Sequence, residues 1–310
     1  MKTLKPGKMK KLLFGIIVIV SGLFIQACTQ KSGFLAADAL KSGVIELVAA
    51  DSQVDNIVET ASYESDVFSL ANASVITFST GLKSATIGGG VFKNMFELFP
   101  NFKLRYLRGI CPDLAITSTN GGFPKTMTID YGTGLEMSNG HILKGKIIVV
   151  LSAAPFVSGS TRTVTFENFG ADSITVSGTA TKTRTKDVQI KFTENSDMTV
   201  TLANGTIIHR VSVHVKNWTA GSDTEFNPAD DVIEITGSVT VSDSKGNEYS
   251  KIITTPLVKT GTCKFITKGV IAYKNSVGKF ATIDFGNGDC DNKAMRTTQK
   301  GTSEMILGKQ

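Results

Sequence analysis

An acidic stretch near the C-terminus has the residue types of a cation site. In "DFGNGDCDN", Asp284, Asp289 and Asp291 are interspersed with asparagine and glycine. Carboxylate and amide oxygens at alternate positions can hold calcium. The spacing and the terminal glutamate of an EF-hand loop are absent, however, and Asp, Asn and Gly are also the residues that tight turns select. We therefore expect a turn and no resident cofactor, with a calcium site as the alternative.

The sequence lacks the motifs of the common nucleophilic and metal-dependent enzymes. It contains no G-x-S-x-G, no H-E-x-x-H and no phosphate-binding loop, so we assign no catalytic residue. His209 and His214 lie an odd number of residues apart on one predicted strand, and therefore point to opposite faces and cannot share a zinc ion. His209 shares its face with three valines, which predicts a packed histidine. His214 shares its face with charged and polar side chains, which predicts a solvated one.

Trp218 is the candidate binding residue. It follows a predicted strand in "VKNWTAGSD" and is the single tryptophan of the chain. An exposed ring at this position could stack on a sugar, whereas a buried ring would close the edge of the core. The loop that follows, "GSDTEFNPADD", is acidic, and we expect it to be solvated.

The acidic stretch belongs to a local repeat. "TIDYGTG" begins at Thr128, and "TIDFGNG" begins at Thr282. In each copy a cysteine precedes the motif, Cys111 by 17 residues and Cys263 by 19, and a Lys-Gly pair follows it. We interpret the copies as the ends of equivalent strands, each followed by a glycine-rich turn that its aspartate secures.

The second copy predicts a disulfide. "YKNSVG", from Tyr273 to Gly278, has the pattern of a hairpin turn and lies midway between Cys263 and Cys290. The two cysteines would then face each other at the open end of the hairpin, within bridging distance. Cys111 is left over, and we expect it to be a free, buried thiol.

The N-terminus has the pattern of a secretory signal peptide. Five lysines precede an apolar run from Leu12 to Ile25, which is shorter than the roughly 20 residues of a spanning helix. The run ends in "IQAC", which resembles a bacterial lipobox with Cys28 as the lipidated residue. Removal of residues 1–27 lowers the formal net charge from +6 to about +1, so the basic balance gives no support for a nucleic-acid partner. We expect the lipid anchor to make the membrane a partner.

The mature chain begins with a short tether and a helical stretch. Apolar residues recur at helical spacing between Phe34 and Leu70, which predicts one or two short helices. Asp51 and Ser52 lie between the two apolar groups and are predicted to cap the second helix.

From about Ser74 onward the pattern is that of antiparallel strands. Thr- and Val-rich segments alternate with period two and are separated by turn residues, among which Asn204-Gly205 is the strongest hairpin signal and Ser244 to Asn247 forms another turn. We expect Val, Ile and Phe on the inward faces and Thr and Lys on the outward faces. Residues 81–108 have no assigned structure.

These patterns predict a mainly β protein. We expect an elongated antiparallel β-sandwich or a large twisted antiparallel sheet with an internal repeat, preceded by one or two short N-terminal helices. Residues 1–27 form the predicted lipoprotein signal peptide, 28–73 the lipid-anchored tether and short helical segment, and 74–310 the repeat-containing antiparallel β domain.

Two C-terminal segments resemble a known family. "TTPLVKTGTCKFITKGVIAY" and "ATIDFGNGDCDNKA" resemble the C-terminal module of uncharacterised β-rich lipoproteins of Bacteroidota, and "FPKTMTIDYGTG" resembles the central repeat of that family. The resemblance covers most of the mature chain. It implies that Cys263 and Cys290 form a pair and that Cys28 is the lipid site, although Phe265 stands where a tryptophan is expected. It implies no activity.

The combined features predict a lipid-anchored cell-envelope protein. The first hypothesis is a non-enzymatic scaffold or binding protein with an envelope protein or glycan as its partner. The alternative is a glycan-active enzyme, or a calcium-dependent glycan-binding protein that uses the three aspartates above and Trp218. Because no acidic run follows Cys28, we expect the periplasmic face of the outer membrane rather than the cell surface.

Overall fold

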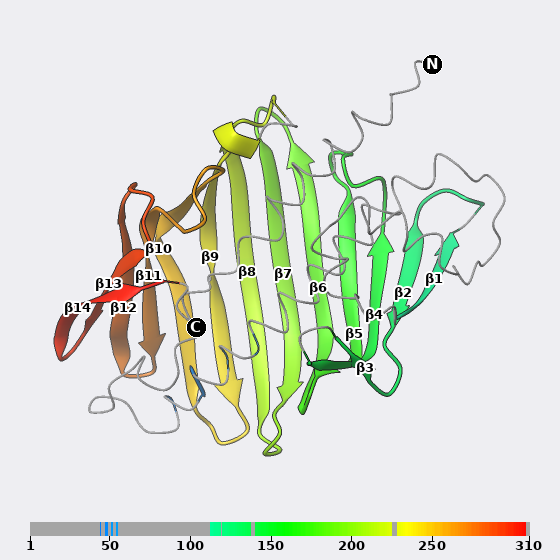
Figure 1. Cartoon of the computed structure of the whole chain (residues 1–310), viewed down its shortest axis with the longest axis horizontal. Helices are drawn as coiled ribbons and strands as arrows, with labels where there is room; N and C mark the ends of the chain where they lie inside the picture. Colours follow the sequence, from blue (N-terminus) through cyan, green and yellow to red (C-terminus); the bar gives the residue numbers. More distant parts are fainter. Residues whose placement is uncertain are drawn as a thin grey trace.

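The computed structural model describes residues 44, 47, 48, 51, 54, 112–118, 120–137, 140–224 and 228–307. These residues form one open sheet of 14 antiparallel strands, with the longest strands at its centre (Figure 1). The predicted mainly β fold is therefore confirmed, in its form as a large sheet. The predictions for the signal peptide, Cys28, Cys111 and residues 81–108 lie outside the described residues.

The sheet is a meander. Its strands pair in the order in which they occur along the chain, and only β3 lies beside this path, where it pairs with β4. A short 3₁₀ helix, η4 (Pro228–Asp230), precedes β9. The strands are β1 (Asp113–Ser118), β2 (Lys125–Asp130), β3 (Leu135–Glu136), β4 (Ile142–Leu151), β5 (Thr161–Ala171), β6 (Ile174–Lys186), β7 (Ile190–Thr201), β8 (Ile207–Ala220), β9 (Val232–Asp243), β10 (Glu248–Thr260), β11 (Lys268–Asn275), β12 (Gly278–Asn287), β13 (Lys293–Thr298) and β14 (Gly301–Ile306).

Short side chains close the turns between consecutive strands. Between β7 and β8, the backbone N–H of Thr206 donates to Oδ1 of Asn204 at 3.0 Å. Between β9 and β10, Oδ1 of Asp243 accepts from the backbone N–H groups of Lys245 and Asn247, both at 2.9 Å. Both hairpin turns predicted from the sequence are confirmed, because Asn and Asp satisfy the backbone groups of the turns locally.

The repeated motif has the same hydrogen bond in both copies. Oδ1 of Asp130 accepts a hydrogen bond from the backbone N–H of Gly132 at 2.9 Å. Oδ1 of Asp284 accepts one from Gly286, also at 2.9 Å. Both glycines have positive φ, 62° and 88°, a region that glycine enters without steric cost. Asp130 ends β2 and secures the turn that follows, as predicted, whereas Asp284 and Gly286 lie inside β12 at an irregularity of its pairing with β11, so the turn predicted there is wrong.

The two copies differ beyond the turn. Lys144 and Gly145 lie inside β4, which pairs with the strand of the first motif. Lys300, by contrast, lies in the turn between β13 and β14, one strand further from the strand of the second motif. The hydrogen bond from glycine to aspartate is thus the feature that both copies share, and the longer module stays a prediction from the sequence.

Two glycines allow the long central strands to approach one another closely. A Cβ atom on Gly178 would lie 2.2 Å from the carbonyl oxygen of Asp197, and one on Gly237 would lie 2.1 Å from that of Val213. Their φ angles are 125° and 142°. Any other residue at either position would force neighbouring strands apart, because real Cβ atoms do not come this close to a carbonyl oxygen.

One face of the sheet carries the core. Buried residues from both ends and from the centre of the sheet point to this face and are fully inaccessible, among them Ile129, Phe169, Val241 and Ile283. This face is called the inward face below. Its continuous apolar cluster extends from β1 to β14, as expected for a sheet buried on one side.

The five described N-terminal residues extend this core. Val44, Leu47, Val48, Asp51 and Val54 are helical, which confirms the helical prediction at these positions. Their spacing of three or four residues places most of them on one side of a helix. The four aliphatic side chains belong to the same buried cluster as the strands, so this side packs on the sheet.

The predicted disulfide is present. Strands β11 and β12 form the predicted hairpin, with Asn275 paired to Gly278 at its turn. Cys263 precedes the hairpin and Cys290 follows it, and their sulfurs are bonded with a Cα–Cα distance of 5.6 Å. The bridge closes the open end of the hairpin.

The bridge should contribute measurably to stability. The double change Cys263→Ser and Cys290→Ser is expected to lower the free energy of unfolding by about 3.5 kcal/mol, because the bridged residues are 27 positions apart. Urea denaturation followed by circular dichroism measures the difference, and reduction of the wild-type protein should reproduce it. A loss below about 1 kcal/mol would contradict the expected restriction of the unfolded chain.

Candidate functional site

Strand β8 turns its polar side chains inward. Arg210, Ser212 and Lys216 are buried, whereas Val211 and Val213 are 37% and 45% exposed. This is the reverse of the predicted orientation, in which the valines faced the core. The reason lies in two carboxylates on the inward face, because Glu194 of β7 pairs with Lys216 and Asp51 pairs with Arg210.

The two histidines of β8 are reversed in the same way. His209, predicted to be packed, is exposed, and its Nε2 lies 2.8 Å from Oδ1 of Asp197. His214, predicted to be solvated, points inward, and burial together with the nearby cations Lys216 and Arg210 lowers its pKa to about 4. His214 is therefore neutral at pH 7.

A row of charged residues crosses four strands on the inward face. Arg162 of β5 is paired with Lys182 of β6, Lys182 with Glu194 of β7, and Glu194 with His214 of β8. Directly paired residues in antiparallel strands lie on the same face, so these four side chains are neighbours. We call them, together with Lys216, the Glu194 cluster.

Glu194 bridges two lysines from the strands on either side. Its Oε1 lies 3.4 Å from Nζ of Lys182, and its Oε2 lies 2.7 Å from Nζ of Lys216. Burial opposes ionisation of Glu194, but the two lysines and Arg162 outweigh it and hold the pKa of this carboxyl far below its usual range. Burial and repulsion from Arg162 and Lys216 lower the pKa of Lys182 to about 7, despite its attraction to Glu194.

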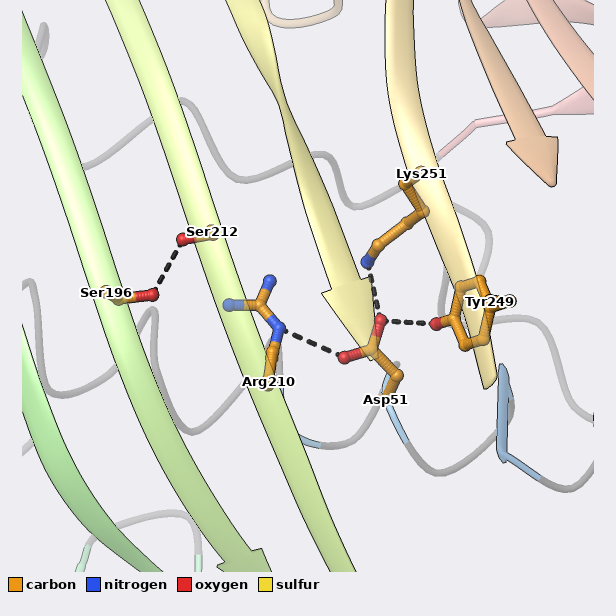
Figure 2. Close-up of polar contacts among 6 residues, drawn as sticks. All are labelled: Asp51, Ser196, Arg210, Ser212, Tyr249 and Lys251. Carbon is orange, nitrogen blue, oxygen red and sulfur yellow. Dashed lines mark hydrogen bonds and ion pairs between the residues drawn. The ribbon is translucent and has the colours of Figure 1, made fainter. Parts of the chain in front are cut away.

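A second cluster joins the N-terminal helical residues to the sheet (Figure 2). Oδ1 of Asp51 lies 3.0 Å from Nε of Arg210, and Oδ2 lies 2.6 Å both from Nζ of Lys251 and from the hydroxyl of Tyr249. The Asp51 and Arg210 side chains are almost completely buried. We call these four residues the Asp51 cluster.

The sequence predicted that Asp51 caps a helix, but its carboxylate has a different role. Asp51 is itself helical, and side chains of β8 and β10 engage both of its oxygens. Burial opposes its ionisation, but Lys251, Arg210 and the hydrogen bond from Tyr249 lower its pKa to about 2. The buried carboxylate is therefore charged at neutral pH and is held by opposite charges.

A serine pair lies beside the two clusters on the same face. The hydroxyl oxygens of Ser196 on β7 and Ser212 on β8 are 2.6 Å apart, and Figure 2 shows the pair next to the Asp51 cluster. Each carboxylate of the two clusters is thus held by cations, and the serines are held by one another. This arrangement can neutralise buried charge and fix the register of strands.

Two of the three calcium candidates bond the backbone two residues ahead. Asp284 accepts from Gly286 inside β12, and Oδ1 of Asp291 accepts from the backbone N–H of Lys293 at 3.0 Å. Asp289 is exposed. Within the described ranges, no group of three or more His, Cys, Asp and Glu side chains could hold a metal ion.

Trp218 is buried at the end of β8. It is 5% exposed, and its Nε1 donates to Oδ1 of Asp231 at 3.1 Å. Its ring closes an edge of the core, the second of the two roles considered for it, and does not offer a surface for stacking on a sugar. Asp231 is also buried, although its loop was predicted to be solvated.

Sequence reasoning missed the Glu194 cluster and the sheet side of the Asp51 cluster. One signal was available, because "TATKTRTK" in β6 alternates Lys182 and Arg184 with threonines, while Glu194 on the next strand has the opposite charge.

No protein-family model matches the chain, and no curated protein or solved structure shows significant similarity to it. Among the described residues, no helix has the length and hydrophobicity needed to cross a membrane.

The Asp51 cluster yields a test of stability. Asp51→Asn removes one charge of a buried, paired set and should lower the free energy of unfolding at pH 7 by about 3 to 5 kcal/mol. The folded pKa of about 2 lies below the ordinary value of 3.8, so the stabilisation is present at neutral pH and is lost as the pH falls from about 5 to about 2.

Denaturant titrations of wild type and Asp51→Asn between pH 2 and pH 7 should therefore show a difference in the free energy of unfolding that becomes smaller in acid. Glu304→Gln is the matched control, because Glu304 pairs with Lys293 at 3.2 Å on the surface and should cost less than about 1 kcal/mol. If the loss of unfolding free energy caused by Asp51→Asn stayed constant over the whole pH range, the charge pairing would be contradicted.

The ionised carboxylate of Asp231 should destabilise the fold, whereas that of Asp51 stabilises it. Burial raises its pKa to about 6, and its Oδ2 has no hydrogen-bond partner. Because the folded pKa lies above the unfolded one, the stability present below about pH 4 is lost as the pH rises through about 6. Asp231→Asn keeps an acceptor for Trp218 and cannot ionise, so it should raise the melting temperature above pH 6.

Thermal unfolding from pH 4 to pH 8 measures this effect. The advantage of the Asp231→Asn protein should shrink toward pH 4, where the wild-type carboxyl is protonated. If Asp231→Asn melted at a lower temperature than wild type at pH 8, the ionised carboxylate of Asp231 could not be destabilising the fold.

Proposed function

We propose that this protein is a lipid-anchored scaffold or binding protein of the cell envelope and that it is not an enzyme. The signal-peptide pattern and Cys28 support the anchor, as the sequence predicts. The geometry supports a structural use of the sheet. The outer membrane, on its periplasmic face, is the proposed location.

One observation carries the non-enzymatic part of the proposal. The inward carboxylates Glu194 and Asp51 are each bonded to cations from two strands, Glu194 to β6 and β8 and Asp51 to β8 and β10. A general base must instead be free to reach a substrate proton. The strongest concentration of titratable groups in the described part therefore serves to hold strands together.

The outward face supports a binding role. Threonines lie directly opposite one another across β5 and β6, as Thr163 with Thr181 and Thr165 with Thr179. The array continues onto β7, where Thr193 is paired with Thr183. Each hydroxyl can donate and accept, so the face offers many exchangeable hydrogen bonds to a polar partner such as a glycan or an envelope protein.

The anchor is tested by metabolic labelling with an alkyne fatty acid. The wild-type protein should incorporate the label, and Cys28→Ser should lose it, because a lipoprotein is acylated on the cysteine of its lipobox. Cys111→Ser is the control and should label like wild type. Label retained by Cys28→Ser, or absent from wild type, would remove the anchor from the proposal.

The non-enzymatic part is tested with purified protein. Incubation with a panel of bacterial and host polysaccharides should give no new reducing ends, while the threonine face should support binding to immobilised envelope material. Turnover of any polysaccharide, or binding that requires calcium, would favour the alternative of a glycan-active or calcium-dependent protein.

A further inference from the structure

Apolar side chains are exposed in the turns at one end of the sheet. Phe123 is 36% exposed, Phe156 42%, Val157 50% and Val188 95%. They lie in the connections that follow β1, β4 and β6. Every second connection of an antiparallel meander lies at the same end of the sheet, so these three turns are neighbours, at the upper end of the sheet in Figure 1.

Hydrogen bonds fix two of these turns to each other. The backbone N–H of Lys186 donates to Oγ of Ser158 at 2.8 Å, and Nη1 of Arg184 donates to the carbonyl oxygen of Phe156 at 2.8 Å. The connection after β4 is therefore attached to the end of β6, close to Val188. The apolar side chains are presented on a fixed base.

The turns at the opposite end are mostly polar. They contain Asp172-Ser173 after β5, Asn204-Gly205 after β7 and Lys245-Gly246 after β9. The exception among these turns is Val277 after β11, which is 90% exposed, and Ile142 and Ile207 are 45% and 47% exposed where β4 and β8 begin at this end. Within the turns themselves, the exposed apolar side chains are thus concentrated at the upper end, over β1 to β7.

The charges beside these turns are mainly positive. Lys186 and Lys191 are exposed on either side of Val188, with Asp187 as the one exposed acid between them. The acidic residues of this end, such as Asp223 and Asp230, follow β8 and lie over the other half of the sheet. Exposed aromatic and aliphatic side chains beside lysines are the combination that binds the interface of an anionic bilayer.

We propose that the turns after β1, β4 and β6 contact the surface of an anionic lipid bilayer. Phe156, Val157 and Val188 enter the interface between headgroups and acyl chains, and the lysines remain at the level of the headgroups. The inference rests on the proposed anchor in one respect. A lipid on Cys28 would keep the sheet near the membrane and so convert a weak contact into an effectively intramolecular one.

The test uses the mature chain with Cys28→Ser, which carries no lipid, so that the turns are measured alone. The protein is sedimented with vesicles of phosphatidylglycerol and phosphatidylethanolamine, and with vesicles of phosphatidylcholine. The triple variant Phe156→Ser, Val157→Ser and Val188→Ser removes the apolar tips. Val277→Ser is the matched control, because it removes an equally exposed valine from the opposite end.

The unaltered chain should bind the anionic vesicles, more weakly as salt is added, and should bind phosphatidylcholine less. The triple variant should lose at least about tenfold in partitioning, since each buried apolar side chain contributes roughly that factor. Val277→Ser should bind like the unaltered chain. Circular dichroism confirms that the variants are folded.

Three results would overturn the inference: no binding by the unaltered chain, unchanged binding by the triple variant, or an equal loss with Val277→Ser. These results are independent of the fatty-acid labelling of Cys28. If the protein is labelled but does not bind vesicles, the lipid anchor stands and the contact of the turns with the bilayer is wrong. If the protein binds vesicles but is not labelled, the contact stands and the anchor is wrong.

Discussion

Charged side chains on the inward face of this sheet are stable only if they neutralise one another away from water. Glu194 meets this requirement between β6 and β8, through Lys182 and Lys216. Asp51 meets it between β8 and β10, and it does so from outside the sheet. Two carboxylates therefore connect the central strands to each other and to the N-terminal helical residues. The position of the described helical residues on the sheet depends on this pairing, because the other four of them are aliphatic and specify no partner.

Features that depend on local chemistry could be predicted from the sequence. The hairpin turns, the turn after Asp130 and the Cys263–Cys290 bridge each follow from residues within a short segment, where backbone conformation and chain length leave few alternatives. The direction of the faces of β8 could not be predicted in this way. Alternation separates a strand into two sets of side chains but does not say which set faces inward. That choice depends on Glu194 of another strand and on Asp51, 159 residues before its partner Arg210.

The inverted strand changes where a partner could be recognised. With cations turned inward and paired, the outward face keeps hydroxyl groups and a few exposed valines, such as Val211 and Val213. Exposed charged side chains such as His209 and Asp197 lie among them, so contacts with this surface would be made by hydrogen bonds, methyl groups and charges. Threonine and valine have nearly the same shape, so side chains of similar size recur across several strands of this face. The buried charges of the two clusters thus stabilise the interior, while hydroxyl groups on the outward face remain available to a ligand.

The meander order has a consequence for how the chain acquires its structure. Each strand pairs with the strand that precedes it, so most contacts are close in sequence and the sheet can grow strand by strand as the chain is synthesised. The Asp51 cluster is the exception, since Tyr249 follows Asp51 by 198 residues. The N-terminal helical residues are synthesised first, yet the carboxylate of Asp51 has no site until β8 and β10 exist. The first described part of the chain is therefore among the last to reach its final place.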